Sequence, residues 1–217
     1  LSSRLVFATG TSIAHLLNSL SLSHTHTHTH SYDRSLFERF FKSMRMDTIE
    51  DENICYTFEE TMEYMDGSAA VIGDFMCTIL MRGKEHEKAI RGARALGNAF
   101  QLTNMIRDVE EDLGLGREYW PRNMCLHRKV CLREISTVRE SSNFASLVED
   151  LFEKTDAFYT VADKAIDFLP IQAGRVVRVA SEAYHGIHEK IRASNYDLFS
   201  GKRARLSFFE KLAIARR

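Results

Sequence analysis

Hydrophobic residues recur at intervals of three and four along almost the whole chain after residue 31, which is the spacing of one face of an α-helix. Outside one short repeat, apolar and polar residues do not alternate with the two-residue period of a β-strand, so the predicted fold class is all-α. Pro170 divides two of the helices, and Gly114 and Gly116 mark the end of another. The predicted helices cover residues 37–44, 57–81, 85–113, 147–169, 172–192 and 206–217.

The exception to this pattern is the segment Ser19–His30, which reads SLSLSHTHTHTH. Alternating histidines can bind metal ions, and an exposed polar strand is a second interpretation. A third is favoured: Ser-Leu and His-Thr are encoded by TC and CA dinucleotide repeats, so the segment resembles translated non-coding DNA. Residues 1–31 are therefore expected to be disordered and without function. The chain begins at Leu1 instead of methionine, so we expect a fragment or a partial gene sequence.

The composition is that of an ordinary globular protein, with 44% hydrophobic and 27% charged residues. The formal net charge is −1, which gives no electrostatic reason to expect a nucleic-acid partner. The sequence contains no apolar run long enough for a transmembrane helix. Its four cysteines follow no zinc-site or disulfide pattern, and we interpret them as structural residues in a reducing compartment.

The most informative polar residues lie in the predicted helix 85–113. Asn104, Asp108 and Asp112 are four residues apart, so they stack along one helix face at about 6 Å per step. Magnesium commonly binds one or two carboxylates together with substrate phosphates, which makes this row a candidate site. A solvated acidic face is the alternative, since Glu110 and Glu111 lie nearby. Apolar residues interleave with the row and Gln101 precedes it by one turn, and this context favours the site.

The surrounding sequence resembles two motifs of the squalene/phytoene synthase family. Residues 96–112 and 116–121 are similar to the family's second aspartate-rich motif, and residues 64–73 are similar to a motif upstream of it. Weaker similarity runs from Asp33 to the end of the chain. The resemblance implies an isoprenoid-synthase-like helical bundle around a central cavity, incomplete at the N-terminus, with residues 32–217 as the C-terminal two thirds of the domain.

The resemblance also implies roles for individual residues. Small side chains at Ala69, Ala70 and Gly73 would leave room for an isoprenoid tail, or would serve helix packing alone. Tyr184 is similar in placement to a cavity tyrosine, with an ordinary core tyrosine as the alternative. The implied set comprises the Mg²⁺ (or Mn²⁺) ligands Asn104, Asp108 and Asp112, the catalytic residues Tyr64, Asp108 and Asp112, and the substrate-binding residues Gln101, Arg107, Arg117 and Tyr184.

The implied reaction is head-to-head condensation of two prenyl diphosphates, with two molecules of geranylgeranyl diphosphate giving phytoene for carotenoid biosynthesis. Squalene or dehydrosqualene synthesis from farnesyl diphosphate is an alternative, because residues 117–121 are more similar to squalene synthases. A non-catalytic relative that acts in complex assembly is another alternative. Such relatives tend to lose the carboxylates, whereas Asp108 and Asp112 are present here.

One expected feature is missing from the chain. The family uses a first aspartate-rich motif well upstream of residue 44, where only the repeat-containing segment stands. The run 47–51 has the DxxxD spacing, but its flanks resemble a different family segment. This chain alone is therefore expected to be inactive. Peripheral membrane association is left open. The compartment is also left open: a plastid, the cytosol or a membrane surface of a eukaryotic cell.

Overall fold

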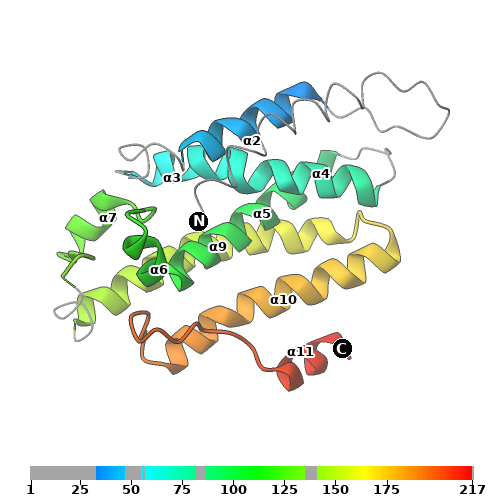
Figure 1. Ribbon diagram of the computed structural model, residues 1–217. Helices are drawn as coiled ribbons and strands as arrows, with labels where there is room; N and C mark the ends of the chain where they lie inside the picture. The colour runs from blue at the N-terminus through cyan, green and yellow to red at the C-terminus, as the bar shows by residue number, and fades with distance from the viewer. Residues whose placement is uncertain (1–32, 47–54, 56, 82–86, 135–140, 217) are drawn as a thin grey trace, which may run out of the picture. The chain divides into compact units, whose positions relative to one another are not determined.

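The computed structural model describes residues 33–46, 55, 57–81, 87–134 and 141–216, and it confirms the all-α prediction (Figure 1). The predictions made for residues 1–31 and 47–51 lie outside this part of the chain. The helices are α2 (Arg34–Met46), α3 (Phe58–Met65), the π-helical turn η1 (Asp66–Ala70), α4 (Val71–Leu80), α5 (Glu87–Arg107), α6 (Val109–Gly114), α7 (Arg122–His127), α9 (Ser142–Ile166), α10 (Ile171–Ala193) and α11 (Phe208–Ala215).

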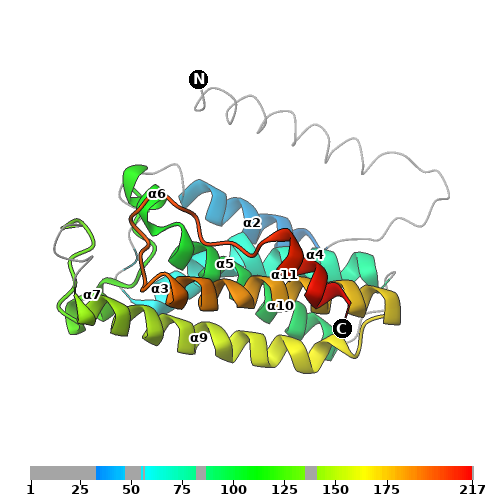
Figure 2. The same cartoon turned by 90° about the horizontal axis from the view of Figure 1, so that it is seen from below.

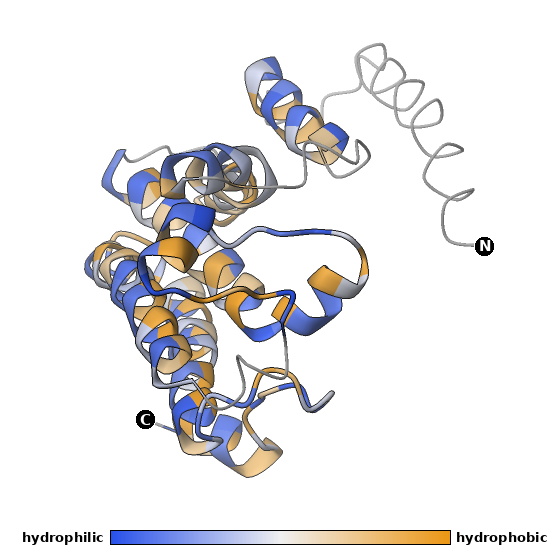
Figure 3. Ribbon diagram, turned by 90° about the vertical axis from the view of Figure 1, so that its left-hand side faces the viewer, coloured by the Kyte–Doolittle hydropathy of each residue, from blue (hydrophilic) through white to orange (hydrophobic). Residues whose placement is uncertain are grey.

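Helix α5 is the central element of residues 33–216. It packs against η1 and α4 on one side and against α9 and α10 on the other. Helix α2 covers η1, and α11 packs on α10 (Figures 1 and 2). Polar and apolar residues alternate around the helices (Figure 3), as expected where one face of each helix meets a core. Helix α5 therefore has a neighbouring helix on most of its sides.

Local sequence explains where several helices begin. Thr57 and Glu60 form a capping box at the start of α3, and Ser207 and Glu210 form another at the start of α11. In each box the hydroxyl accepts a hydrogen bond from the backbone N–H three residues on, while the glutamate accepts one from the backbone N–H of the capping residue. These bonds satisfy backbone donors that have no partner within the helix.

Helix α7 was not predicted, and two predicted helices are interrupted in the structure. The predicted helix 57–81 contains the π-helical turn η1, which inserts one extra residue per turn. The predicted helix 85–113 is divided at Asp108, whose backbone angles of φ −103° and ψ 15° separate α5 from α6. Even so, the Asp108 amide donates to the Asn104 carbonyl at 2.8 Å, and the Asp112 amide donates to the Asp108 carbonyl at 3.0 Å. The four-residue spacing of these three side chains therefore survives the break.

Close helix packing accounts for the small residues of η1 and α4. A β-carbon at Gly73 would lie 2.3 Å from the Ala93 carbonyl oxygen, and one at Gly97 would lie 2.5 Å from the Ala69 carbonyl oxygen. Real β-carbons do not approach oxygen so closely, so glycine at these two positions allows α5 to contact the backbone of η1 and α4. Within the small-residue run, close packing thus requires glycine at position 73.

Candidate active site

The row formed by Asn104, Asp108 and Asp112, called the polar row below, lies where α5 ends and α6 begins. The Asn104 side-chain oxygen Oδ1 is buried and has no hydrogen-bond partner among the described residues. Such an atom is costly to bury unless something else binds to it. Asp112 lies one turn beyond Asp108, and its backbone carbonyl accepts a hydrogen bond of 2.9 Å from the Arg117 amide, which anchors the loop after α6 to the row.

Two arginines flank the Asp108 carboxylate. Arg107 donates to both carboxylate oxygens, at 2.7 and 2.6 Å. Arg203 also donates to both, with its Nε 2.7 Å from Oδ1. Burial of Asp108 opposes its ionisation, but the hydrogen bonds from Arg107 and Arg203 outweigh that effect, and the pKa of Asp108 lies below its ordinary value. The carboxylate is therefore charged at neutral pH.

Arg203 was not predicted from the sequence. It lies between α10 and α11, on a segment that runs back past α6 (Figure 2). Two contacts tether this segment to α6: the Gly201 amide donates to Glu110 Oε2 at 2.9 Å, and Arg203 binds Asp108. The sequence feature that could have indicated this contact is a group of basic residues, Lys202, Arg203 and Arg205. Sequence alone does not tell which of them reaches a residue 95 positions earlier in the chain.

An apolar pocket of about 300 Å³ lies beside α5, between α4, α9 and α10. Its lining includes Gly73, Leu96, Gly97, Phe100 and Ala180, and the lining of this pocket is almost entirely hydrocarbon. Phe100 lies one helical turn before Asn104, so the apolar pocket is adjacent to the polar row along α5. A molecule with a hydrocarbon tail and an anionic head could place the tail in the apolar pocket and the head at the polar row.

Tyr184 on α10 stands beside this pocket. Its ring stacks on Phe100 with centroids 4.3 Å apart and planes at 29°. Gln101 and Asn104 are half-buried on α5, one turn apart, so Gln101 belongs to the same stretch of helix as the polar row. Gln101, Asn104 and Arg107 thus lie on the last turns of α5, and Asp108, which pairs with Arg107, follows directly.

Tyr64 has a different environment from the one expected. It is buried in the core, where its ring stacks on Tyr119 with centroids 4.8 Å apart, and its hydroxyl donates to that of Tyr119 at 3.4 Å. Within the described residues, neither Tyr64 nor Ala69 and Ala70 line the apolar pocket, whereas Gly73 does. Thr61 on the same helix donates to the Tyr119 carbonyl at 3.1 Å. Helix α3 thereby holds the loop that follows Arg117.

Acidic and amide oxygens, paired guanidinium groups and a neighbouring hydrocarbon-lined pocket thus lie together in an all-helical fold. Comparison with known proteins gives the particular family. The model of the squalene/phytoene synthase family matches residues 18–210, so the chain belongs to the squalene/phytoene synthase family. That family carries out head-to-head condensation of prenyl diphosphates.

Individual relatives agree with this assignment. A phytoene synthase of Thermus thermophilus is 33% identical over 160 residues, which cover 73% of this chain and 53% of the relative. A presqualene diphosphate synthase of Rhodopseudomonas palustris is 29% identical over 164 residues, covering 75% of this chain and 57% of the relative. The chain thus spans about half the length of these curated relatives.

The fold is also found among solved structures. A dehydrosqualene synthase crystal structure superposes with a TM-score of 0.74 at 21% identity, covering 84% of this chain and 62% of that one. YisP from Bacillus subtilis gives a TM-score of 0.73 at 20% identity, with 85% and 72% covered. The predicted isoprenoid-synthase-like fold is therefore confirmed. None of the helices in the described part of the chain combines the length and the hydropathy needed to cross a membrane.

Proposed function

We propose that this chain carries the diphosphate-binding part of a Mg²⁺-dependent enzyme that condenses two molecules of geranylgeranyl diphosphate head to head to phytoene. The observation that carries the proposal is the adjacency of the polar row to the hydrocarbon-lined pocket along one helix. The polar row would hold the diphosphate, while the pocket would take the prenyl tail. Burial of apolar tail surface would supply the binding energy.

The residues of the polar row fit a hard divalent cation. The unpartnered Oδ1 of Asn104 and the carboxylates of Asp108 and Asp112 are oxygen ligands of the kind that Mg²⁺ or Mn²⁺ prefers. When bound, the ion would supply charge neutralisation of the departing diphosphate. In the structure Arg107 and Arg203 already occupy the Asp108 carboxylate. Arg203, with a side chain 56% exposed, is the partner that can move away most easily.

The protein's own residues would act on the substrate in two ways. Arg107, Arg117 and Arg203 supply guanidinium groups that can pair with diphosphate oxygens in bidentate fashion. They would stabilise the negative charge that grows on the diphosphate as the allylic C–O bond breaks. The pocket would keep water from the allylic cation that remains. The ring of Phe100 lines the pocket, with Tyr184 stacked on it, and its aromatic face would attract that cation.

The substrate's chain length separates this proposal from its nearest alternative. Squalene or dehydrosqualene synthesis would use farnesyl diphosphate, and residues 117–121 were the sequence feature that favoured it. The phytoene synthase and the presqualene diphosphate synthase match this chain at similar identity, 33% and 29%. The preference for geranylgeranyl diphosphate therefore rests on sequence similarity around residues 101–109 and 195–197.

The test measures binding separately from turnover. Calorimetric titration of the full 217-residue chain with geranylgeranyl or farnesyl diphosphate should show binding that requires Mg²⁺ and favours the longer substrate. Asp112→Asn should weaken this binding by at least about tenfold, because a metal ligand is lost. Glu153→Gln, which removes an exposed carboxylate of α9, serves as the matched control and should leave binding unchanged.

Three results would contradict parts of the proposal. Binding that is insensitive to Mg²⁺ and to Asp112→Asn would remove the polar row from the site. Tighter binding of farnesyl diphosphate would favour the squalene or dehydrosqualene alternative. Absence of any prenyl diphosphate binding would favour the non-catalytic role in complex assembly. Turnover is followed separately by extraction of the C40 hydrocarbon, and we expect none from this chain alone, because it contains only one recognised aspartate-rich motif.

A further inference from the structure

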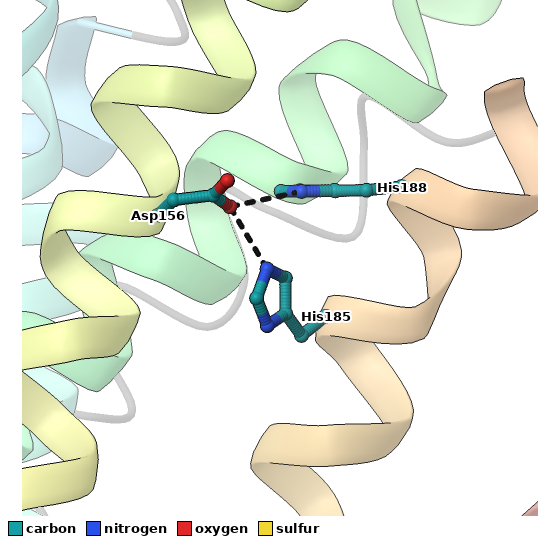
Figure 4. A group of neighbouring side chains, drawn as sticks. All are labelled: Asp156, His185 and His188. Carbon is teal, nitrogen blue, oxygen red and sulfur yellow. Dashed lines mark hydrogen bonds and ion pairs between the residues drawn. The ribbon is translucent and has the colours of Figure 1, made fainter.

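A second group of ligand-type side chains lies between α9 and α10. Asp156 on α9 faces His185 and His188, which are three residues apart on α10 (Figure 4). His185 Nε2 lies 2.8 Å from Asp156 Oδ1, and His188 Nδ1 lies 3.3 Å from the same oxygen. One nitrogen or oxygen atom from each of the three residues lies within 4.8 Å of the other two. We call this group the Asp-His-His cluster.

One atom of the cluster is buried without a hydrogen bond. The His188 side chain is 1% exposed, and its Nδ1 faces Asp156 but makes no hydrogen bond to any residue that the structure describes. The other ring nitrogen, Nε2, contacts the Thr103 hydroxyl at 3.2 Å, and that hydroxyl contacts the Tyr159 hydroxyl at 3.1 Å. When Nε2 carries the proton, Nδ1 presents a lone pair to a carboxylate oxygen, and the two repel each other unless a cation lies between them.

Both imidazole rings are held in place by aromatic neighbours. His188 stacks on Phe152 with centroids 4.0 Å apart, and His185 stacks on Tyr159 with centroids 4.4 Å apart. Rings fixed in this way keep their nitrogens directed at Asp156 without further loss of side-chain freedom. The contact between the Thr103 hydroxyl and His188 Nε2 helps to orient the ring, as outer hydrogen bonds do for metal-bound histidines.

The charges and the exposure around the cluster also bear on metal binding. The guanidinium of Arg192, one turn further along α10, is paired with Glu149 at 2.7 Å. The side chains of His185 and Asp156 are 43% and 42% exposed, which leaves an entry path and room for a water ligand.

We infer that the Asp-His-His cluster binds one transition metal ion of the Zn²⁺ type, at a site separate from the polar row. Two imidazoles and one carboxylate are a ligand set that Zn²⁺ accepts and Mg²⁺ does not favour. Tetrahedral bonds of roughly 2.0–2.1 Å place ligand atoms about 3.3 Å apart, close to the two distances around Asp156 Oδ1. The three ligand atoms lie within 4.8 Å of one another, so the imidazole nitrogens would have to approach each other by at most about 1.5 Å.

The ion would connect two helices that border the proposed prenyl pocket. His185 directly follows Tyr184, whose ring stacks on Phe100, and Thr103 directly precedes Asn104 of the polar row. A metal bound by Asp156 and both histidines would tie α9 to α10 at the level of these residues. It would thereby fix the turn of α10 that carries Tyr184. This role is structural, and it does not depend on which prenyl diphosphate the polar row binds.

The test must exclude the alternating histidines near the N-terminus, which can bind Zn²⁺ themselves. All measurements therefore use the full chain with His24→Ala, His26→Ala, His28→Ala and His30→Ala as the background. After removal of metals with a chelator, the chain is titrated with Zn²⁺ by calorimetry in excess Mg²⁺, and with Co²⁺ by visible absorption. The expected result is one ion per chain, with intense Co²⁺ bands of tetrahedral coordination.

Variants then identify the ligands. His185→Ala and Asp156→Asn, both at half-exposed positions, should each weaken Zn²⁺ binding by at least about tenfold. Thr103→Val, which keeps the side-chain volume, should weaken it by about tenfold by releasing the His188 ring. His127→Ala, at an exposed histidine on α7, is the matched control and should bind as the background does. Circular dichroism establishes that each variant is folded.

Two outcomes would overturn the inference. One is the absence of saturable binding of one Zn²⁺ per chain in the background without the alternating histidines. The other is binding that His185→Ala and Asp156→Asn leave at the background affinity. In either case the cluster would be a hydrogen-bonded pair of histidines around a carboxylate and no more. Because Mg²⁺ is present throughout, neither outcome bears on the polar row.

Discussion

Asp108 and Arg203 are 95 residues apart in the sequence, yet Arg203 Nε lies 2.7 Å from Asp108 Oδ1. The contact joins the segment between α10 and α11 to the break between α5 and α6. It places a guanidinium group with a 56% exposed side chain beside a carboxylate that is 13% exposed. Two arginines therefore lower the pKa of the carboxylate at the centre of the polar row, Arg107 at the end of α5 and Arg203 from the segment after α10.

The first prediction concerns acid sensitivity. Since the pKa of Asp108 is lower in the folded chain than in the unfolded chain, the unfolded state binds more protons as the pH falls. The stabilisation from Asp108 is complete above the unfolded pKa and is lost as the pH drops through the folded pKa, from about pH 5 downward. Asp108→Asn should cost about 2 kcal/mol at pH 7 and much less at low pH. Urea unfolding at both pH values measures this.

An exposed carboxylate provides the control for that experiment. Asp167→Asn removes a side chain that is 79% exposed and pairs with Arg178 at the surface. Surface pairs of this kind contribute little to stability, so this variant should follow the pH profile of the unmodified chain. An equal loss of stability for Asp108→Asn at low and at neutral pH would contradict the role given to the two arginines.

The second prediction tests the close packing of η1 and α5. Gly97→Ala would place a β-carbon 2.5 Å from the Ala69 carbonyl oxygen, a backbone atom that cannot move aside easily. We expect a loss of about 1–3 kcal/mol in the free energy of unfolding. Gly114→Ala is the matched control, because nothing lies within 4 Å of the position that its β-carbon would take. A Gly97→Ala variant as stable as the Gly114→Ala variant would show that the helices can separate without cost.

Sequence patterning was sufficient for the class of fold, whereas the polar row stays a prediction. The spacing of apolar residues located the longer helices but not α7, and backbone hydrogen bonds over four residues still join Asn104 to Asp108 and Asp108 to Asp112. Those features depend on neighbours within one or two turns. The break itself and the π-helical turn η1 were missed, because each depends on what packs against α5 and α3 in three dimensions.

Contacts between distant helices could not be predicted. The sequence offered no way to tell that Arg203, among several basic residues near it, reaches Asp108. Likewise Asp156 lies on α9 and the two histidines on α10, and only the rotation of each helix about its axis brings them together. The environment of Tyr64 depends in the same way on where the loop with Tyr119 folds back. Helical periodicity gives the face of one helix but not the partner that the face meets.

The third prediction concerns the length of the prenyl tail. Ala93 lines the apolar pocket eleven positions before Asn104, so it lies about 16 Å from the polar row along the helix axis. Ala93→Phe should shorten the pocket and weaken binding of geranylgeranyl diphosphate more than binding of farnesyl diphosphate. Ala157→Phe adds the same side chain at an exposed position of α9 and should change neither. Calorimetric titration with both diphosphates measures the ratio, and an equal loss for the two substrates would place the tail elsewhere.

The last prediction separates stability from binding at Asn104. Its Oδ1 is buried without a hydrogen-bond partner, so the side chain costs the folded chain free energy in the absence of a ligand. Asn104→Leu replaces the amide with an apolar group of similar size and should raise the free energy of unfolding by about 1 kcal/mol. The same change removes an oxygen ligand, and Mg²⁺-dependent prenyl diphosphate binding should fall by at least about tenfold. Thermal unfolding and calorimetry on one preparation test both effects. A variant that gains stability and keeps its Mg²⁺-dependent binding would remove Asn104 from the metal site. A polar group retained for its ligand should instead give higher stability and weaker binding when it is replaced.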